Sequence, residues 1–330
     1  MTATPLDEFG LIARYFTRAP KRAALGVGDD CALLAPLPAG QQLAVSSDML
    51  VEGRHFLSTV APDRLGHKAL AVNLSDLAAC GAEPLAFTLA LAMPRVDEVF
   101  LEGFSRGLFA LADAQGIELV GGDTTAGPLN ICITVFGAVT VGQALLRSGA
   151  RAGDALWVSH PVGGGLGDAR LALEVFRGRV SLPGEAFEAV RLRMECPTPR
   201  IALGLALRGV ASSAIDLSDG LVGDLGHVLA RSGGGATVDA DALPTSAVLA
   251  SLPRALQYEC GLAGGDDYEL LFSAPPDAGP AVLAAARHAD VAVTRIGTIE
   301  ATAGLRIVDA RGAPLQQRYA AFDHFRSDDA

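Results

Sequence analysis

The sequence predicts an α/β (α+β) fold with two domains. Short apolar runs typical of strands alternate along the chain with longer stretches typical of helices, which favours mixed layers of sheet and helix. The chain has 330 residues, and a length of roughly 150 residues per domain then favours two domains. Half of the residues are hydrophobic and 19% are charged, so a disordered chain is excluded.

The first predicted elements are a strand and a long helix. The apolar run 43–47 ends in polar residues and predicts a short strand. Residues 62–80 predict a helix, because Pro62 and Asp63 favour its first turn and Gly81 supplies a stop.

Three strands and a second helix complete the first half. Residues 85–93 predict a buried strand, and 96–115 predict a helix that ends at Gly116. Further strands are expected at 117–120 and 131–139.

A joint rich in small and charged residues, 147–154, precedes a predicted strand at 156–159. We therefore expect one domain over 1–147 and a second over 148–330. In the second domain the glycine run 163–165 precedes a predicted helix at 166–176. The remaining expected elements are a helix at 201–208, a strand at 214–217 and a helix at 221–231.

Composition excludes several classes of protein. The chain has 26 Lys and Arg against 37 Asp and Glu, a formal net charge of -11, which argues against a nucleic-acid coat protein. The longest apolar run, 84–94, is too short to span a membrane, and residues 1–10 do not resemble a signal peptide. The five cysteines are widely spaced without a C-x-x-C pair. We expect a cytoplasmic protein that does not bind a membrane.

Aspartates next to glycines, or at strand ends, recur along the chain. They occur in the segments 26–30, 46–48, 73–76, 121–125, 216–220 and 264–267. Mg²⁺ prefers oxygen ligands and usually joins one or two carboxylates to phosphate oxygens and waters. Each segment taken alone is also compatible with an ordinary turn, since Asp and Gly are turn residues. Taken together, the segments favour a metal–phosphate site.

Asp76 gives the sharpest indication. It lies in a predicted helix that is apolar almost all round and is therefore expected to be buried. An unpaired buried carboxylate is costly, so Asn73, Ser75 and Asp76 need partners, and a metal cluster would supply them. The same reasoning applies to Asp216 and Asp219, three residues apart across a strand-to-helix junction.

Other candidates remain open from the residues alone. The glycine run 163–167 resembles a phosphate loop but lacks the Lys-Ser/Thr of a Walker A motif, which favours a flexible turn before a helix. Arg54 and His55 follow Asp48 in a polar loop that either contacts a substrate phosphate or is simply solvated. Arg147 either pairs with nucleotide phosphates or caps a surface turn.

Long motifs over most of the chain resemble the thiamine-monophosphate kinase family. They are EFGLIARYF (8–16), GVGDDCALL (26–34), KALAVNLSDLAA (68–79), GGDTT (121–125), RSGA (147–150), AIDLSDGL (214–221) and DHF (323–325). The resemblance implies a fold like that of aminoimidazole ribonucleotide synthetase, with an N-terminal sheet domain that dimerises and a C-terminal α/β domain. It implies a homodimer that uses ATP and several Mg²⁺ ions to phosphorylate thiamine monophosphate.

The resemblance also implies roles for individual residues. The implied Mg²⁺ ligands are Asp30, Ser46, Ser47, Asp48, Asp76, Asp123, Asp216 and Asp219. The implied ATP contacts are Ser105, Gly122, Asp123, Arg147 and Ser218. The implied substrate contacts are His55, Asp266, and Tyr319 or Phe322 as an aromatic wall.

The sequence departs from the family at two of these places. Asp266 replaces the usual Glu of the family's GGEDYEL segment and is one methylene shorter. At Phe322 the family usually has Tyr or Trp, so stacking on a ring survives but a hydroxyl contact does not.

A phosphate acceptor is already ionised near neutral pH, so we nominate no catalytic base. Metal ions held by aspartates would neutralise and align the two polyanions instead. Two alternatives stay open: another synthetase of the superfamily, acting on a formyl-amidine or selenide, and an inactive nucleotide-binding module.

Overall fold

The computed structural model describes residues 7–317 and 319. Four strands and three helices form the first part of the protein. The chain divides into two units, 1–77 with 82–142, and 78–81 with 143–330. The elements of the first unit are α1 (Glu8–Tyr15), β1 (Gln41–Val51), α2 (Pro62–Cys80), β2 (Glu83–Met93), α3 (Glu98–Gln115), β3 (Glu118–Ala126) and β4 (Asn130–Thr140). The last turn of α2 is grouped with the second unit. The domain boundary expected after residue 147 stays a prediction.

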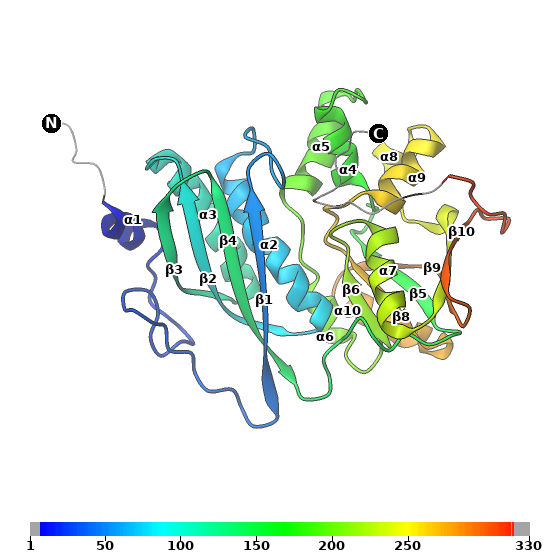
Figure 1. Ribbon diagram of the computed structural model, residues 1–330, viewed down its shortest axis with the longest axis horizontal. Coiled ribbons are helices and arrows are strands. Elements are labelled where there is room, and N and C mark those ends of the chain that lie inside the picture. The colour runs from blue at the N-terminus through cyan, green and yellow to red at the C-terminus, as the bar shows by residue number, and fades with distance from the viewer. Residues whose placement is uncertain (1–6, 318, 320–330) are drawn as a thin grey trace. The chain divides into compact units, whose positions relative to one another are not determined.

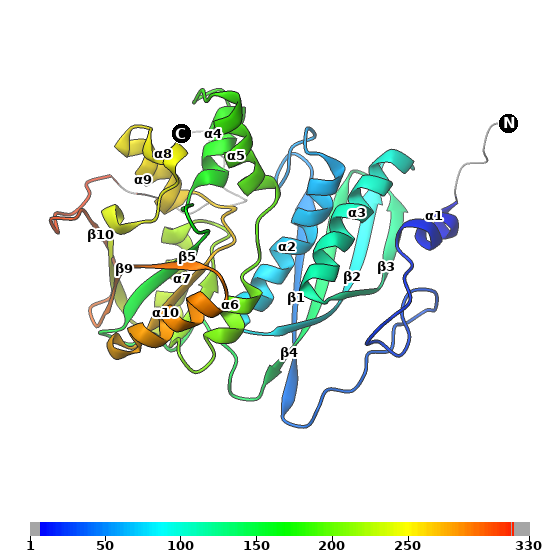
Figure 2. The same ribbon diagram turned by 180° about the vertical axis from the view of Figure 1, so that it is seen from behind.

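The strands of this unit pair in the order β1-β4-β2-β3, with β2 and β3 parallel and the other pairs antiparallel. Helices α2 and α3 cover one face of the sheet, behind it in Figure 1 and in front of it in Figure 2. Leu50, Leu89 and Ile133 are buried on the covered face. Alternation of side chains directs Val45 and Met49 to the other face, where both are exposed.

The predicted helix 62–80 coincides with α2, and the predicted helix 96–115 is confirmed as α3. The strand expected at 117–120 is longer than predicted, because β3 continues to Ala126. The extension pairs in parallel with β2, from Thr88 opposite Gly121 to Met93 opposite Ala126. Gly121–Thr125 therefore lies within a strand and not at its end.

The second unit has one larger sheet surrounded by shorter helices. Its elements are β5 (Ala155–His160), α4 (Asp168–Phe176), α5 (Gly184–Glu195), α6 (Ile201–Ala206), β6 (Ser213–Asp216), α7 (Leu221–Ser232), β7 (Gly235–Asp239), η1 (Ala240–Ala242), α8 (Ala247–Ala250), α9 (Arg254–Ala263), β8 (Leu270–Ala274), η2 (Pro276–Ala278), α10 (Gly279–His288), β9 (Ala292–Glu300) and β10 (Gly304–Val308). The strands pair in the order β10-β7-β9-β5-β8-β6.

Apolar side chains of α7 and the sheet form the main core of this unit. Leu225 and Val228 of α7 pack in one buried cluster with Val158 of β5, Val238 of β7 and Leu271 of β8. The α/β alternation predicted for this half is confirmed, while α5 was not predicted as a helix. In the described residues no helix is both long enough and apolar enough to cross a bilayer.

Candidate functional site

The first unit holds a polar cluster where β1 passes α2. Ser46 and Asp48 alternate with Ser47 along β1 and lie on the same face as buried Leu50, toward the helices. The Ser46 hydroxyl donates to Oδ2 of Asp76 over 2.5 Å. Two of the predicted metal ligands, Ser46 and Asp76, are therefore in direct contact.

Asn73 joins the same helix to the strand. Its Oδ1 accepts from the backbone N–H of Asp48 over 3.0 Å, and its Nδ2 donates to the carbonyl oxygen of Ala69 over 3.0 Å. Asn73 is 1% exposed, whereas Asp76, three residues further along the same side of the helix, is only partly buried. The expectation that these polar side chains need partners is met for both, and the carboxylate keeps some access to solvent.

Ser47 and Asp123 lie on the opposite, uncovered face of this sheet. The register places Asp123 in one row with Ala90, Cys132 and Met49, and this row faces the same side as Ser47. The Ser47 hydroxyl bonds to the Thr134 hydroxyl, 2.9 Å away, and donates to the Ile133 carbonyl oxygen, 3.2 Å away. Asp123 is exposed. The ligands predicted in this unit are thus divided between two faces.

The other predicted residues of this unit are spread over different elements. Asp30 is exposed in the long segment before β1. Nδ1 of His55 accepts from the Val51 N–H over 3.0 Å, so a neutral imidazole carries its proton on Nε2. The Ser105 hydroxyl donates to the carbonyl oxygen of Glu102 over 3.3 Å, within its own helix α3.

In the second unit, the end of β6 and the loop that leads to α7 carry three predicted residues. Asp216 ends β6 and is 5% exposed, and Ser218 and Asp219 follow it. Oδ2 of Asp224, in α7, accepts from the N–H groups of Ser218 and Asp219, both over 3.1 Å. A side chain in the first turn of α7 therefore fixes the backbone of this loop.

Burial raises the pKa of Asp224 to about 7, with the charge of Asp219 adding to the rise. The two N–H donors and Arg147 act in the opposite direction. Sequence reasoning missed Asp224. The local signal was an acidic residue in the first turn of a helix that follows a Gly, where such a side chain can reach loop N–H groups.

The segment containing Asp266 lies against this loop. The Asp266 N–H donates to the Ser218 carbonyl oxygen over 2.9 Å, and the Tyr268 N–H donates to that of Leu217 over 2.8 Å. Only glycine fits at Gly265, because a Cβ there would lie 2.5 Å from the carbonyl oxygen of Ser218. The structure therefore brings the predicted substrate residue Asp266 beside the predicted nucleotide and metal residues of the loop.

Arg147 and Tyr319 also belong to this unit. The carbonyl oxygen of Arg147 accepts from the Ser232 hydroxyl over 3.1 Å. Tyr319 is partly buried against the main core, and burial raises its pKa, with Tyr258 and Glu259 adding to the rise. Phe322 lies outside the described residues.

The oxygen ligands offered by the polar cluster of the first unit and by the loop after β6 in the second unit both fit a hard divalent cation. Carboxylate and hydroxyl oxygens predominate in each, which suits Mg²⁺. Within 7–317 and 319, no three His, Cys, Asp or Glu side chains gather closely enough to hold one ion. Mg²⁺ bound with nucleotide needs only one or two protein carboxylates, since phosphates and waters complete its shell.

Comparison with known proteins gives the relationship of the chain. Family models for the AIR synthase related protein match it twice, the N-terminal domain at 28–139 and the C-terminal domain at 151–310. A thiamine-monophosphate kinase of Salmonella typhimurium is 46% identical over 324 residues, covering 96% of this chain and 98% of that protein.

Two solved structures agree with this relationship. A thiamine-monophosphate kinase from Stenotrophomonas maltophilia K279a is 45% identical with a TM-score of 0.82, covering 92% of this chain and 95% of that one. AaThiL complexed with AMPPCP and TMP is 28% identical with a TM-score of 0.75, covering 88% and 90%. The chain belongs to the thiamine-monophosphate kinase family, within the AIR synthase related proteins.

Proposed function

We propose that this protein is a thiamine-monophosphate kinase, which transfers the γ-phosphoryl group of ATP directly to the phosphate of thiamine monophosphate. The observation that carries the proposal is 46% identity along 96% of the chain to an enzyme of that name. The structural similarity to AaThiL complexed with AMPPCP and TMP supports both proposed substrates.

Mg²⁺, when bound, would neutralise the phosphate oxygens of both substrates and polarise the transferring group. We propose that Asp48 and Asp76 hold it in the first unit and Asp216 and Asp219 in the second. Neighbouring groups orient these carboxylates or their backbone. The Ser46 hydroxyl restrains Asp76 over 2.5 Å, and Asn73 fixes the backbone of Asp48 over 3.0 Å. Such prior orientation lowers the cost of assembling the site when nucleotide arrives.

No side chain needs to remove a proton in this mechanism. The acceptor is a phosphate oxygen, already ionised near neutral pH, so positioning and charge neutralisation are sufficient. We therefore propose direct in-line transfer without a phosphorylated protein intermediate. With an isotopically chiral γ-phosphate, a single inversion of configuration is expected, and net retention would contradict direct transfer.

We propose that Asp266 and an aromatic side chain receive the thiamine part of the substrate. The thiazolium ring is a cation, which favours both a carboxylate partner and the face of an aromatic ring. Tyr268 orients the Asp266 carboxylate, since the Tyr268 hydroxyl donates to Oδ1 of Asp266 over 3.0 Å. Tyr319 and Phe322 remain the two candidates for the aromatic wall.

We also propose a homodimer formed through the sheet of the first unit. Leu43, Val45 and Met49 of β1 are exposed, and the alternation of side chains places them on the face that α2 and α3 leave uncovered. Apolar side chains gathered on a sheet face mark an interaction surface. Because the reaction consumes ATP, we propose a cytoplasmic location.

An ADP-release assay tests the function. Thiamine monophosphate is compared with thiamine, a formyl-amidine nucleotide and selenide, each with Mg-ATP. We expect ADP release only when thiamine monophosphate is the acceptor, with thiamine diphosphate as the second product. Turnover of another acceptor would show that the protein is a different synthetase of the superfamily. The absence of turnover with every acceptor would show that it is an inactive nucleotide-binding module.

A further inference from the structure

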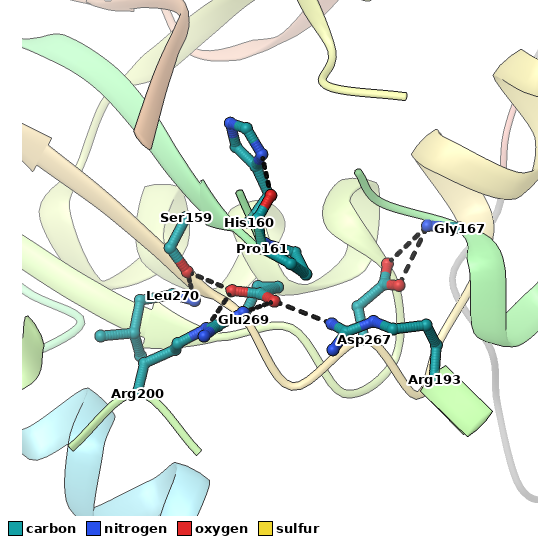
Figure 3. Close-up of polar contacts among 9 residues, drawn as sticks. All are labelled: Ser159, His160, Pro161, Gly167, Arg193, Arg200, Asp267, Glu269 and Leu270. Carbon is teal, nitrogen blue, oxygen red and sulfur yellow. Dashed lines mark hydrogen bonds and ion pairs between the residues drawn. The ribbon is translucent and has the colours of Figure 1, made fainter. Parts of the chain in front are cut away.

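Glu269, three residues after Asp266, is a fully buried carboxylate held by three side chains (Figure 3). Its Oε2 accepts from the Ser159 hydroxyl and from Nε of Arg200, both over 2.6 Å. Its Oε1 accepts from Nη2 of Arg200 over 2.5 Å and from Nη2 of Arg193 over 3.0 Å. These partners come from β5, α5 and the start of α6, so Glu269 joins three separate elements of the second unit.

Ser159 transmits this anchoring to the sheet. While it donates to Glu269, its oxygen accepts from the Leu270 N–H over 2.8 Å. Leu270 pairs directly with Asp216 across β8 and β6. The position of Asp216, a proposed metal ligand, is thereby coupled to the Glu269 network.

The backbone of Glu269 reaches the neighbouring loop as well. Its carbonyl oxygen accepts from the Leu217 N–H over 2.8 Å, one residue before Ser218. This bond continues the series in which Tyr268 and Asp266 donate to Leu217 and Ser218. The two segments therefore lie together over three consecutive backbone bonds.

A second buried carboxylate anchors the same turn from its other side. Both oxygens of Asp267 lie within hydrogen-bond distance of the Gly167 N–H, at 2.9 and 3.1 Å. Gly167 ends the glycine run 163–167, which resembles a phosphate loop in sequence. Here its final N–H is directed to a carboxylate of the protein.

The turn that carries these two anchors has a strained backbone. Asp266 has φ of 67° and Tyr268 has φ of 50°, both in the left-handed region that residues with a Cβ rarely adopt. Such a conformation persists only when the surrounding structure holds the residue in place. Asp267 and Glu269 flank Tyr268 and supply fixed points on both sides.

We propose that Glu269, together with Arg193 and Arg200, is a positioning residue. It holds the turn bearing Asp266 against the loop bearing Ser218 and Asp219, so that the thiamine contact and the metal–nucleotide contacts keep a fixed spacing. Glu269 itself is fully buried, so in this role it acts through the turn and not by direct contact with substrate. This inference rests on the proposed function, since it assumes that Asp266 contacts thiamine monophosphate.

Glu174 provides a matched control for the same chemistry. It is 3% exposed and pairs with three arginines, Arg170, Arg177 and Arg179, at 2.9, 3.2 and 3.3 Å. It lies on α4, whereas the side chains that hold Glu269 come from β5, α5 and the residue before α6. A purely structural role for Glu269 predicts that Glu269→Gln and Glu174→Gln behave alike.

The test compares Glu269→Gln, Arg193→Lys and Glu174→Gln in the full-length protein with Mg-ATP. In Glu269→Gln an amide N–H₂ meets an arginine donor, so the turn is expected to shift. The KM for thiamine monophosphate should rise about 10- to 100-fold, the loss expected from a displacement of about 1 Å. Glu174→Gln should keep the KM for thiamine monophosphate within about twofold of the wild-type value, even where its Tm falls as much as that of Glu269→Gln.

Arg193→Lys decides the matter if Glu269→Gln does not fold. It removes one of four bonds to Glu269 and leaves the Arg200 pair in place. It should raise the KM for thiamine monophosphate more than the KM for ATP. An unchanged KM for thiamine monophosphate in a folded Glu269→Gln or Arg193→Lys variant, or an equal change in Glu174→Gln, would overturn the positioning role alone. A wild-type protein without thiamine-monophosphate kinase activity would instead overturn the proposed function and the inference that rests on it.

Discussion

The backbone N–H of Asp266 donates to the carbonyl oxygen of Ser218 over 2.9 Å. A residue proposed to contact the thiamine moiety is thus joined by main-chain atoms to one proposed to contact the nucleotide. Main-chain bonds do not depend on side-chain identity, so replacing either side chain should leave the two segments joined. Binding defects in such variants then report on lost contacts with ligand.

Removal of divalent metal should abolish nucleotide binding. The chain has a formal net charge of -11, and several proposed site residues are aspartates. Without a cation these carboxylates repel the phosphates of ATP. Titration calorimetry with AMPPCP should show binding with Mg²⁺ and none with excess EDTA. Comparable affinity under both conditions would contradict a metal-mediated nucleotide site.

Asp76→Asn should reduce turnover about 100- to 1,000-fold, the usual cost of removing one electrostatic group from an active site. The amide oxygen still accepts from the Ser46 hydroxyl, so the native fold should persist with nearly unchanged Tm. Turnover is measured across a range of Mg²⁺ concentrations, because a weakened ligand should shift the curve to higher metal.

Asp113→Asn is the control for that experiment. Asp113 is exposed and pairs with Arg18 at 3.0 Å on the surface. Removal of a surface ion pair changes stability by about 0–1 kcal/mol, so its turnover should equal that of the wild type. Wild-type turnover of Asp76→Asn at limiting Mg²⁺ would show that Asp76 is not a metal ligand.

Local signals predicted helices α2 and α3 better than the strand lengths or the supporting residues. Helix α2 was predicted to the residue, because Pro62 and Gly81 mark its ends in the sequence. The full length of β3 depends on pairing with β2, which no local pattern reveals. Glu269 was missed for a related reason, since Arg193 is 76 residues away along the chain. The candidate ligands followed from motifs, whereas the groups that orient them follow only from the fold.

Gly122→Ala should destabilise the first unit, while Gly121→Ala should not. A Cβ at Gly122 would lie 1.8 Å from the carbonyl oxygen of Leu89, and its φ is 151°. At Gly121 no atom lies within 4 Å of the added carbon. Relief of the clash requires the paired strands to move, at a cost of about 1–3 kcal/mol. The neighbouring substitution should stay within about 0.5 kcal/mol.

Urea unfolding of both glycine variants without ligand measures this difference. Nucleotide is omitted because Gly122 is itself a proposed ATP contact. Equal midpoints for Gly122→Ala and Gly121→Ala would show that β2 and β3 are less closely paired than described.

Cys260 should resist alkylation in the native protein, whereas Cys31 should react. Burial raises the pKa of the Cys260 thiol to about 12, while Cys31 is exposed. Because the thiolate is the nucleophile, only about one Cys260 in ten thousand would be reactive at pH 8. Iodoacetamide labelling followed by peptide mass spectrometry should find Cys31 modified in native protein and both modified in urea. Equal native labelling would place Cys260 outside the core.

Asp168→Asn should change how stability depends on pH. Burial raises the pKa of Asp168 above its usual value, although the Ser246 hydroxyl and Arg193 oppose the rise. The folded protein therefore holds this proton more tightly than the unfolded chain does, and folding is favoured at low pH. As pH rises from the unfolded pKa through the folded pKa, the wild type loses this part of its stability.

The asparagine variant cannot ionise at this position and lacks that loss. Its amide oxygen can still accept from the Ser246 hydroxyl, which donates to Asp168 over 2.6 Å in the wild type. The free energy of unfolding of Asp168→Asn, relative to the wild type, should therefore increase with pH. Urea titrations at a series of pH values from acid to mildly alkaline measure this difference. A difference that falls with pH would mean that the folded protein stabilises the ionised carboxylate, with Arg193 outweighing burial. A constant difference would mean that the pKa of Asp168 is the same in the folded and unfolded states, which also contradicts the prediction.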